Sequence, residues 1–259
     1  RPNDYVHAVR EDPARKGLLY AGAQHGMYIS YDDGDSWQNF SLNLSDMPIS
    51  DVMIDGSSIA IATHGRSFYV LDNIEAIRQY TPAIASGSEP YLFAPSSAIR
   101  PGTNVAIRYW LKQAPKTLNV DILDATGKVI RTYKGAPPSD SAKRGQQPGA
   151  ASDDDDDNPR NRQPTAPMVA GLSSMTWDLR IAPATRFPGM ILWGATTNGP
   201  LAMPGTYRVR LTVDGKTLTQ PVTVKRNPLI TDVTLAELKE QFDLAVRIRD
   251  RLSEANQAV

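Results

Sequence analysis

The 259-residue chain carries 28 Lys plus Arg against 28 Asp plus Glu and contains no cysteine. This neutral balance gives no electrostatic reason to expect nucleic acid or an anionic membrane as a partner. Disulfides and thiolate-bound metals are excluded because there is no thiol. No apolar run reaches the roughly 18 residues that a membrane span needs, so no transmembrane segment is predicted. Many short apolar runs, separated by 20 Pro and 18 Gly, favour a mainly β protein.

A repeat occupies the first part of the chain. The segment from His25 to Asp32 resembles the segment from His64 to Asp72, with one residue inserted, and each copy follows a strand of small residues. A period of roughly 40 residues built from short strands is typical of β-propeller blades. Residues 1–75 are therefore predicted to form the last blades of a β-propeller.

The first copy ends in a complete Asp box, S-x-D-x-G-x-[ST]-W, formed by Ser30, Asp32, Gly34, Ser36 and Trp37. We expect Asp32 to accept backbone N–H bonds across a tight turn. Gly34 supplies a positive φ at low cost, and Trp37 is expected to bury its ring between blades. The Asp box is thus predicted to be structural rather than catalytic.

Two further domains are predicted after a connector over residues 76–102, where Pro-containing turns recur. Alternating apolar residues predict an Ig-like β-sandwich over 103–228, with a hairpin at Asp214-Gly215. Within it, residues 137–167 are expected to be a mobile insert because they combine low hydrophobicity with dense charge. The acidic run Asp153 to Asp157 lacks the spaced ligands and central Gly of a calcium loop, so no metal site is predicted.

Residues 229–259 are predicted to be the start of a helical hairpin. A capping box begins at Thr234, and apolar residues follow at steps of three and four. The resulting apolar face includes Leu238, Phe242, Ile248 and Leu252. We expect this face to pack on a partner helix outside the chain, because its exposure to water would be costly.

Several of these motifs, taken in order, resemble the C-terminal part of bacterial exported BNR/Asp-box repeat β-propeller proteins, a sortilin-like or glycosyl-hydrolase-like family. The motifs are the Asp box, Thr63 to Phe68, Leu71-Asp72, Met175 to Arg180 and the helical run Phe242 to Arg251. The resemblance implies blades, then the sandwich, then a helical hairpin. It also implies an extracytoplasmic location: periplasmic, secreted or at the cell surface. The remaining blades and the partner helix would come from the same chain or another one.

The candidate contact residues are His64, Arg66, Phe187 and Trp193. Sialidase-like enzymes bind a carboxylate with three arginines and use a Tyr–Glu pair and an Asp acid. Arg66 is the best match to one such arginine, but no Tyr–Glu pair accompanies it in a matching context. Phe187 and Trp193 lie in an apolar loop, which often marks a contact surface. No catalytic residue, metal or cofactor is predicted.

The sequence therefore predicts a non-catalytic binding or scaffold module of an exported protein, which contacts a protein or a glycan. Two alternatives stay open. The chain could be a fragment of a sialidase-like glycoside hydrolase whose catalytic residues lie in other blades. It could also be a structural accessory subunit of a larger membrane-associated or exported assembly.

Overall fold

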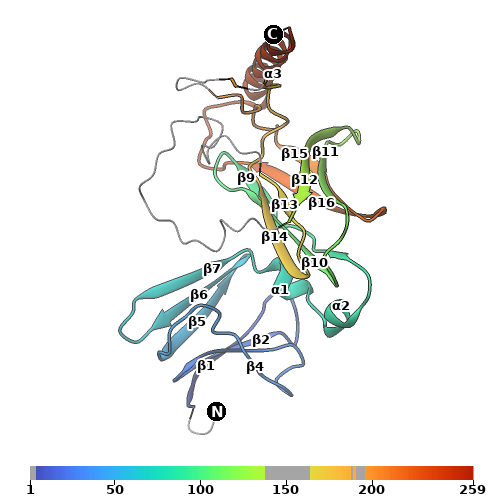
Figure 1. Ribbon diagram of the computed structural model, residues 1–259. Helices are drawn as coiled ribbons and strands as arrows, with labels where there is room; N and C mark the ends of the chain where they lie inside the picture. Colours follow the sequence, from blue (N-terminus) through green and yellow to red (C-terminus); the bar gives the residue numbers. More distant parts are fainter. Residues whose placement is uncertain (1–3, 138–163, 188, 191–195, 259) are drawn as a thin grey trace. The chain divides into compact units, whose positions relative to one another are not determined.

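The computed structural model describes residues 4–137, 164–187, 189–190 and 196–258 (Figure 1). The chain is mainly β, with several sheets and a long C-terminal helix. It divides into two compact units, residues 1–84 and residues 85–259. In the described part of the chain, no helix is both long and apolar enough to cross a membrane.

Two antiparallel meanders build the first unit. Strands pair in the order β1-β2-β3-β4 in the first meander and β5-β6-β7 in the second. The first meander consists of β1 (Val6–Glu11), β2 (Leu19–Ala23), β3 (Gly26–Ser30) and β4 (Gln38–Asn39). The second consists of β5 (Ile49–Asp55), β6 (Ser58–Thr63) and β7 (Phe68–Asp72). The two copies of the sequence repeat form the β2–β3 and β6–β7 hairpins, so the sequence repeat is also a structural repeat.

One apolar core serves both meanders. Tyr20 and Ile29 from the first meander join Val52 and Ile61 from the second, and all four are buried. The meanders approach closely at Gly22, where an added Cβ would lie 2.8 Å from Cγ2 of Ile49. The described residues thus form two meanders around a shared core, and they do not include a closed ring of blades.

Two sheets enclose a second core in the second unit. The larger sheet has the order β13-β12-β11-β15-β16-β9, and the smaller has the order β14-β10-β8. Their strands are β8 (Tyr91–Leu92), β9 (Ala98–Arg100), β10 (Val105–Leu111), β11 (Leu118–Leu123), β12 (Val129–Ala136), β13 (Ala166–Pro167), β14 (Gly171–Trp177), β15 (Gly205–Val213) and β16 (Lys216–Arg226). Alternate residues of both sheets point into one buried cluster, so this unit is a β-sandwich.

The turn and strand signals read from the second unit match its structure. Asp214 and Gly215 both have positive φ, as a tight two-residue hairpin requires. Pro221 lies in a part of β16 that pairs only with β15, because β9 pairs further along at Val224. A residue without a backbone N–H is tolerated there. Trp177 is fully buried and meets Tyr207 edge-on at 5.3 Å between ring centroids.

The predicted connector over 76–102 is more regular than expected. It contains most of α1 (Glu75–Gln79), all of α2 (Pro82–Ser86) and the short strands β8 and β9. Pro82 opens α2, a position where the missing N–H costs nothing. The two strands form because β10 and β16 offer partners distant in sequence. Residues that interrupt helices and strands locally give no information about pairing with segments distant in the sequence.

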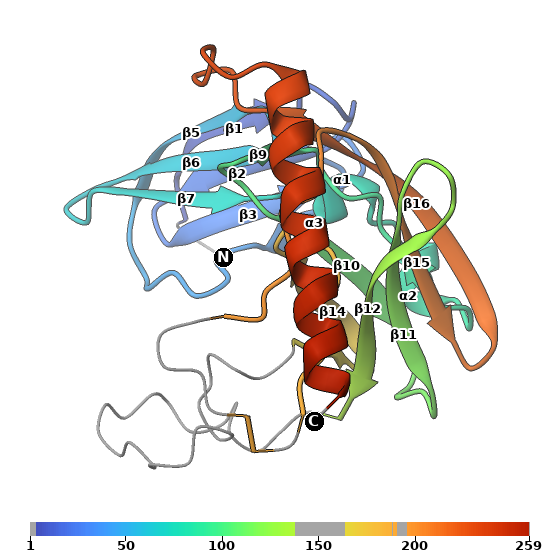
Figure 2. The ribbon, with the colours of Figure 1, turned by 90° about the horizontal axis from the view of Figure 1, so that it is seen from above.

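The C-terminal segment forms one long helix, α3 (Leu235–Gln257) (Figure 2). It begins with the predicted capping box, in which Thr234 and Glu237 exchange hydrogen bonds. Part of the apolar face, which was expected to pack on a partner helix, lies against its own chain. Phe242 and Val246 pack on the sandwich core of the same chain. Polar residues near the helix end bond to the segment 182–185: Arg249 donates to the carbonyl of Ala182 at 2.9 Å. Ile248, expected in the buried face, is 61% exposed.

The expected mobile insert falls almost wholly on residues 138–163, which lie outside the described residues, as does the acidic run Asp153 to Asp157. At its edge, Ala166 is buried, and β13 pairs with β12 in parallel. The end of the predicted insert is therefore part of the sandwich.

Phe242→Ala should destabilise the second unit, because this side chain is half-buried against the sandwich core. A loss of about 1–3 kcal/mol is expected, below the roughly 3–5 kcal/mol of a fully buried aromatic ring. Urea unfolding followed by tryptophan fluorescence measures it. Leu244→Ala is the matched control, because Leu244 is 50% exposed on the same helix and should change stability little. Equal effects of the two variants would show that α3 does not dock through Phe242.

Candidate functional site

The Asp box forms a self-contained turn between β3 and β4. The amide of Ser36 donates to Oδ1 of Asp32 at 2.9 Å, and the amide of Gly34 donates to Oγ of Ser30 at 2.9 Å. The hydroxyls of Ser30 and Ser36 also donate to the Asp32 carboxylate. Gly34 has a φ of +96°, as the tight turn requires. Hydrogen bonds from Ser36 hold the pKa of Asp32 below its ordinary value.

All the polar groups of the box are thus directed at the turn itself. The expected hydrogen bonds of Asp32 are present, but the expected burial of Trp37 is not, because its side chain is 39% exposed. Its ring lies over the turn, with Cζ2 3.9 Å from where a Cβ on Gly34 would stand. In this chain the ring therefore covers the turn instead of filling a gap between meanders.

His64 and Arg66 lie in the exposed β6–β7 turn. The amide of Arg66 donates to Oγ1 of Thr63 at 3.2 Å, and Thr63 in turn donates to the carbonyl of Ser67. His25 occupies the corresponding β2–β3 turn, where Nδ1 meets Asp46 at 2.8 Å. Both histidines thus stand at equivalent hairpins. Among the residues that the structure describes, no group of three or more His, Cys, Asp or Glu could hold a metal ion.

The apolar loop with Phe187 and Trp193 is only partly described. Phe187 is half-buried, whereas Trp193 lies outside the described residues. Met190, from the same loop, is buried and contacts Nδ2 of Asn256 on α3 through its sulfur at 3.8 Å. Part of this loop therefore packs on the helix of its own chain.

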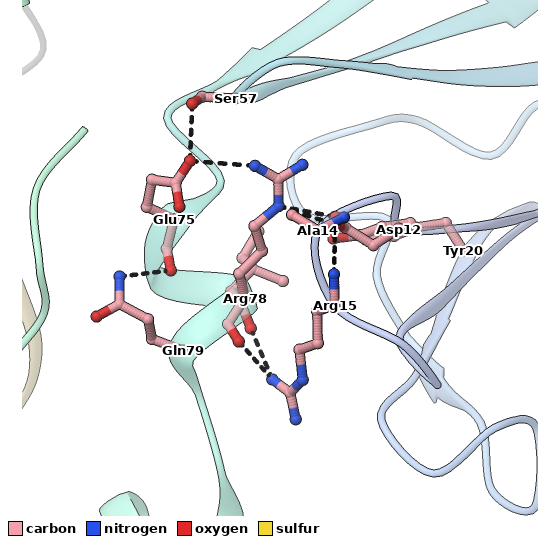
Figure 3. A network of polar contacts seen from close by, with 9 residues as sticks. Asp12, Ala14, Arg15, Tyr20, Ser57, Glu75, Arg78 and Gln79 are labelled. Carbon is pink, nitrogen blue, oxygen red and sulfur yellow. Dashed lines mark hydrogen bonds and ion pairs between the residues drawn. The ribbon is translucent and has the colours of Figure 1, made fainter. Parts of the chain in front are cut away.

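A buried polar network, which the sequence did not reveal, joins the two meanders (Figure 3). Nε of Arg78 donates to both carboxylate oxygens of Asp12, at 2.9 and 3.0 Å, and the Asp12 side chain is fully buried. Arg78 also donates to Glu75 at 3.1 Å, and Ser57 donates to the same Glu75 oxygen at 2.7 Å. Burial lowers the pKa of Arg78, but the bonds and charges of Asp12 and Glu75 outweigh it, so the net pKa is raised.

Arg15 extends this network to the end of α1. Its guanidinium donates to the carbonyls of Arg78 at 2.8 Å and Tyr80 at 2.7 Å, and it stacks over the ring of Tyr31. Carbonyls at a helix end lack intrahelical donors, so a cation there satisfies them. No local signal could have identified these residues, since Asp12 and Arg78 are 66 positions apart. With every carboxylate held by a cation or a hydroxyl, the network is structural.

A cavity in the second unit is the best candidate for binding a small ligand. It has a volume of about 530 Å³ and lies where β9, β16 and the start of α3 meet. Arg100 and Arg226, the last residues of two parallel neighbouring strands, both line it. Small-molecule sites typically occupy roughly 300–1,000 Å³. Neither arginine was a candidate from sequence, because only the pairing of β9 with β16 brings them together.

The chain matches no protein-family model and none of the curated proteins. Among solved structures, CopC from Methylosinus trichosporium OB3b aligns with 54% of this chain and 96% of its own length, at 15% identity and a TM-score of 0.24. The extracellular domain of a candidate one-component system from B. thetaiotaomicron aligns with 88% of this chain, at 8% identity and a TM-score of 0.24. This chain spans only 26% of that domain. At such TM-scores these likenesses bear on neither the fold nor the function.

Arg78→Met should destabilise the first unit strongly, because it leaves the Asp12 carboxylate buried without its cation. Loss of one partner of a buried pair costs about 3–5 kcal/mol. Chemical unfolding monitored by circular dichroism measures the change. Arg10→Met is the matched control: Arg10 pairs with Asp51 at 2.7 Å, but both side chains are about half exposed. An exposed pair contributes less than about 1 kcal/mol. Similar losses in both variants would contradict the central role of the buried pair.

Asp32→Ala should lower the melting temperature in a pH-dependent way. The pKa of Asp32 is lowered in the folded state, so its carboxylate stabilises the fold above its ordinary value of 3.8. That contribution disappears as the pH falls through the lowered pKa. The difference in melting temperature between the native chain and D32A should therefore be largest at neutral pH and should disappear in acid. Asp35→Ala serves as control, and a pH-independent difference for D32A would refute the prediction.

Proposed function

We propose that this chain is a non-catalytic binding or scaffold module of a bacterial extracytoplasmic protein. In this proposal the two meanders are blades of an Asp-box β-propeller, and the sandwich is Ig-like. Further meanders of the same kind cover the exposed face of the second meander. The order of motifs that resembles the BNR/Asp-box family supports the proposal, as do the repeated hairpins.

One observation carries it: a cluster of exposed apolar side chains on the outward side of the second meander, bordered by Asp51 opposite Ala62 and by Ser58 between Asp55 and Asp72. On β6, Ile59 and Ile61 point into the core, so Ala60 and Ala62 point outward. Register places Met53 and Val70 on either side of Ala60, and Phe68 beside Ala62. We call these five residues the outward face: Met53, Ala60, Ala62, Phe68 and Val70.

The outward face is unusual for a surface. Met53 is 62% exposed, Phe68 76% and Val70 63%. Contiguous apolar side chains on a sheet face mark a contact surface or an aggregation hazard. Two of its residues, Phe68 and Val70, belong to β7, an edge strand of the sheet whose free backbone groups favour pairing. In repeat proteins each unit buries its apolar face on the next one, so another meander is the occupant that fits.

The carboxylates that stand out in this unit support a non-catalytic role. Asp32 is held by the hydroxyls and the amide of its own turn. Asp12 is held by Arg78. A glycosidase needs two carboxylates positioned on either side of a substrate, whereas these two are committed to holding the fold. Binding through a surface requires no such pair.

The outward face should make the 259-residue chain self-associate in the absence of further meanders. Sedimentation velocity should show oligomers or aggregates for the native chain. Met53→Lys/Val70→Lys should give a monomer, because two exposed cations on the face repel a second copy. Circular dichroism should show that this variant keeps its strand content, since neither side chain lies in the core.

Leu172→Lys is the matched control. Leu172 is 55% exposed on β14 of the second unit, so it adds a cation at a similarly exposed apolar position away from the outward face. It should leave self-association unchanged. A native chain that is a stable monomer at high concentration would overturn the proposal.

A further inference from the structure

Arg100 is a buried cation that forms no ion pair with any of the described residues. It ends β9 and is only 6% exposed. Its Nε has no hydrogen-bond partner among the described residues. Burial lowers its pKa, and among the described residues only a charge effect of Tyr207 opposes this lowering. Burying a guanidinium away from water without a partner is costly, so such a group is expected to pair with an anion.

Arg226, its neighbour, shows how a satisfied arginine in the same cavity behaves. Arg226 pairs in register with Arg100 across the parallel strands β16 and β9. Its Nη2 donates to the carbonyls of Ile230 at 3.4 Å and Val233 at 2.5 Å. Arg226 therefore holds the loop that leads into α3. With the described residues, the Arg100 side chain makes no comparable contact, although it lines the same cavity of about 530 Å³.

The cavity wall around Arg100 is fixed. The amide of Asn227 donates to the carbonyl of Arg100 at 3.0 Å, and Nδ2 of Asn227 donates to the carbonyl of Pro101 at 2.9 Å. These bonds join the ends of β9 and β16. A site held on paired strand ends is preorganised, which favours binding because little ordering remains to be done.

The remaining lining defines the ligand. Five apolar side chains contribute walls: Pro101, Leu201, Ile230, Val233 and Leu238. Two acids also line the cavity, but both are exposed, and neither exerts a charge effect on Arg100: Asp232 and Glu237. Glu237 is occupied by the capping box of α3. These two acids would repel a multiply charged anion. A ligand with one negative charge and an apolar body matches the buried guanidinium and the apolar walls.

We propose that this cavity binds an apolar monocarboxylate, with the carboxylate paired to Arg100 and the apolar body against the walls. A planar guanidinium presents parallel donors that match a carboxylate. The same chemistry is offered by a free organic acid and by the C-terminus of a peptide that ends in an apolar residue. The site lies in the sandwich unit and is independent of the outward face.

Isothermal titration of the 259-residue chain with octanoate and phenylacetate tests the proposal. The matched amides, octanamide and phenylacetamide, should bind at least about tenfold more weakly, because a charge-assisted hydrogen bond is lost. A short peptide ending in Leu, with a free or an amidated C-terminus, tests whether the carboxylate comes from a peptide C-terminus and not from a free organic acid. Binding of either acid or of the free peptide, but not of its amide, supports the site. Inorganic phosphate should not bind comparably.

Arg100→Met tests the residue itself. The variant should lose carboxylate binding while its melting temperature stays equal or rises, because an unpaired buried cation is removed. Arg108→Met is the control: burial also lowers the pKa of Arg108, but it has a partner and does not line the cavity. The R108M variant should bind as the native chain does. The proposal is overturned by equal affinity for acid and amide, by binding of phosphate alone, by no binding of any probe, or by a lower melting temperature of R100M.

Discussion

The first unit depends on one buried ion pair, between Asp12 and Arg78. Asp12 lies in the loop after β1, and Arg78 lies in α1, after the last strand of the second meander. Their bond therefore joins the beginning of the unit to its end. Asp12 also accepts the amides of Ala14 and Arg15, so the same carboxylate shapes the loop from which Arg15 reaches the end of α1. Because the Asp12 side chain is fully buried, loss of its cation would leave a charge that water cannot solvate.

The two units use buried arginines in opposite ways. Arg78 has its burial cost offset by two carboxylates, and its environment is that of a structural element. Arg100 bears a burial cost that no described acid offsets. A fold under no other constraint would place an uncharged residue at such a position, since this is cheaper. The contrast separates a charge that holds the fold from a charge that is available to a ligand.

The two binding surfaces that we propose, one in each unit, differ in character. The outward face of the second meander consists of apolar residues on a sheet, and another sheet is its proposed partner. The cavity at the ends of β9 and β16 is concave and combines one cation with apolar walls. A scaffold or binding module can use both, because a surface contact and a small-molecule site do not compete for residues. Neither requires the Asp box, whose polar groups are committed to its turn.

Local patterns in the sequence determined much of the fold. Alternation of apolar residues identified the sandwich strands, Asp214-Gly215 a hairpin, Thr234 the start of α3, and the Asp box its turn, because each of these depends on residues close in the chain. The ion pair of Asp12 with Arg78, the strands β8 and β9, and the cavity beside Arg100 were decided by tertiary structure alone. Each depends on segments brought together across many residues, and single-sequence patterns do not encode which distant partners meet. The same reason applies to α3, whose apolar spacing predicted a buried face but could not show that Phe242 and Val246 pack on the sandwich of their own chain.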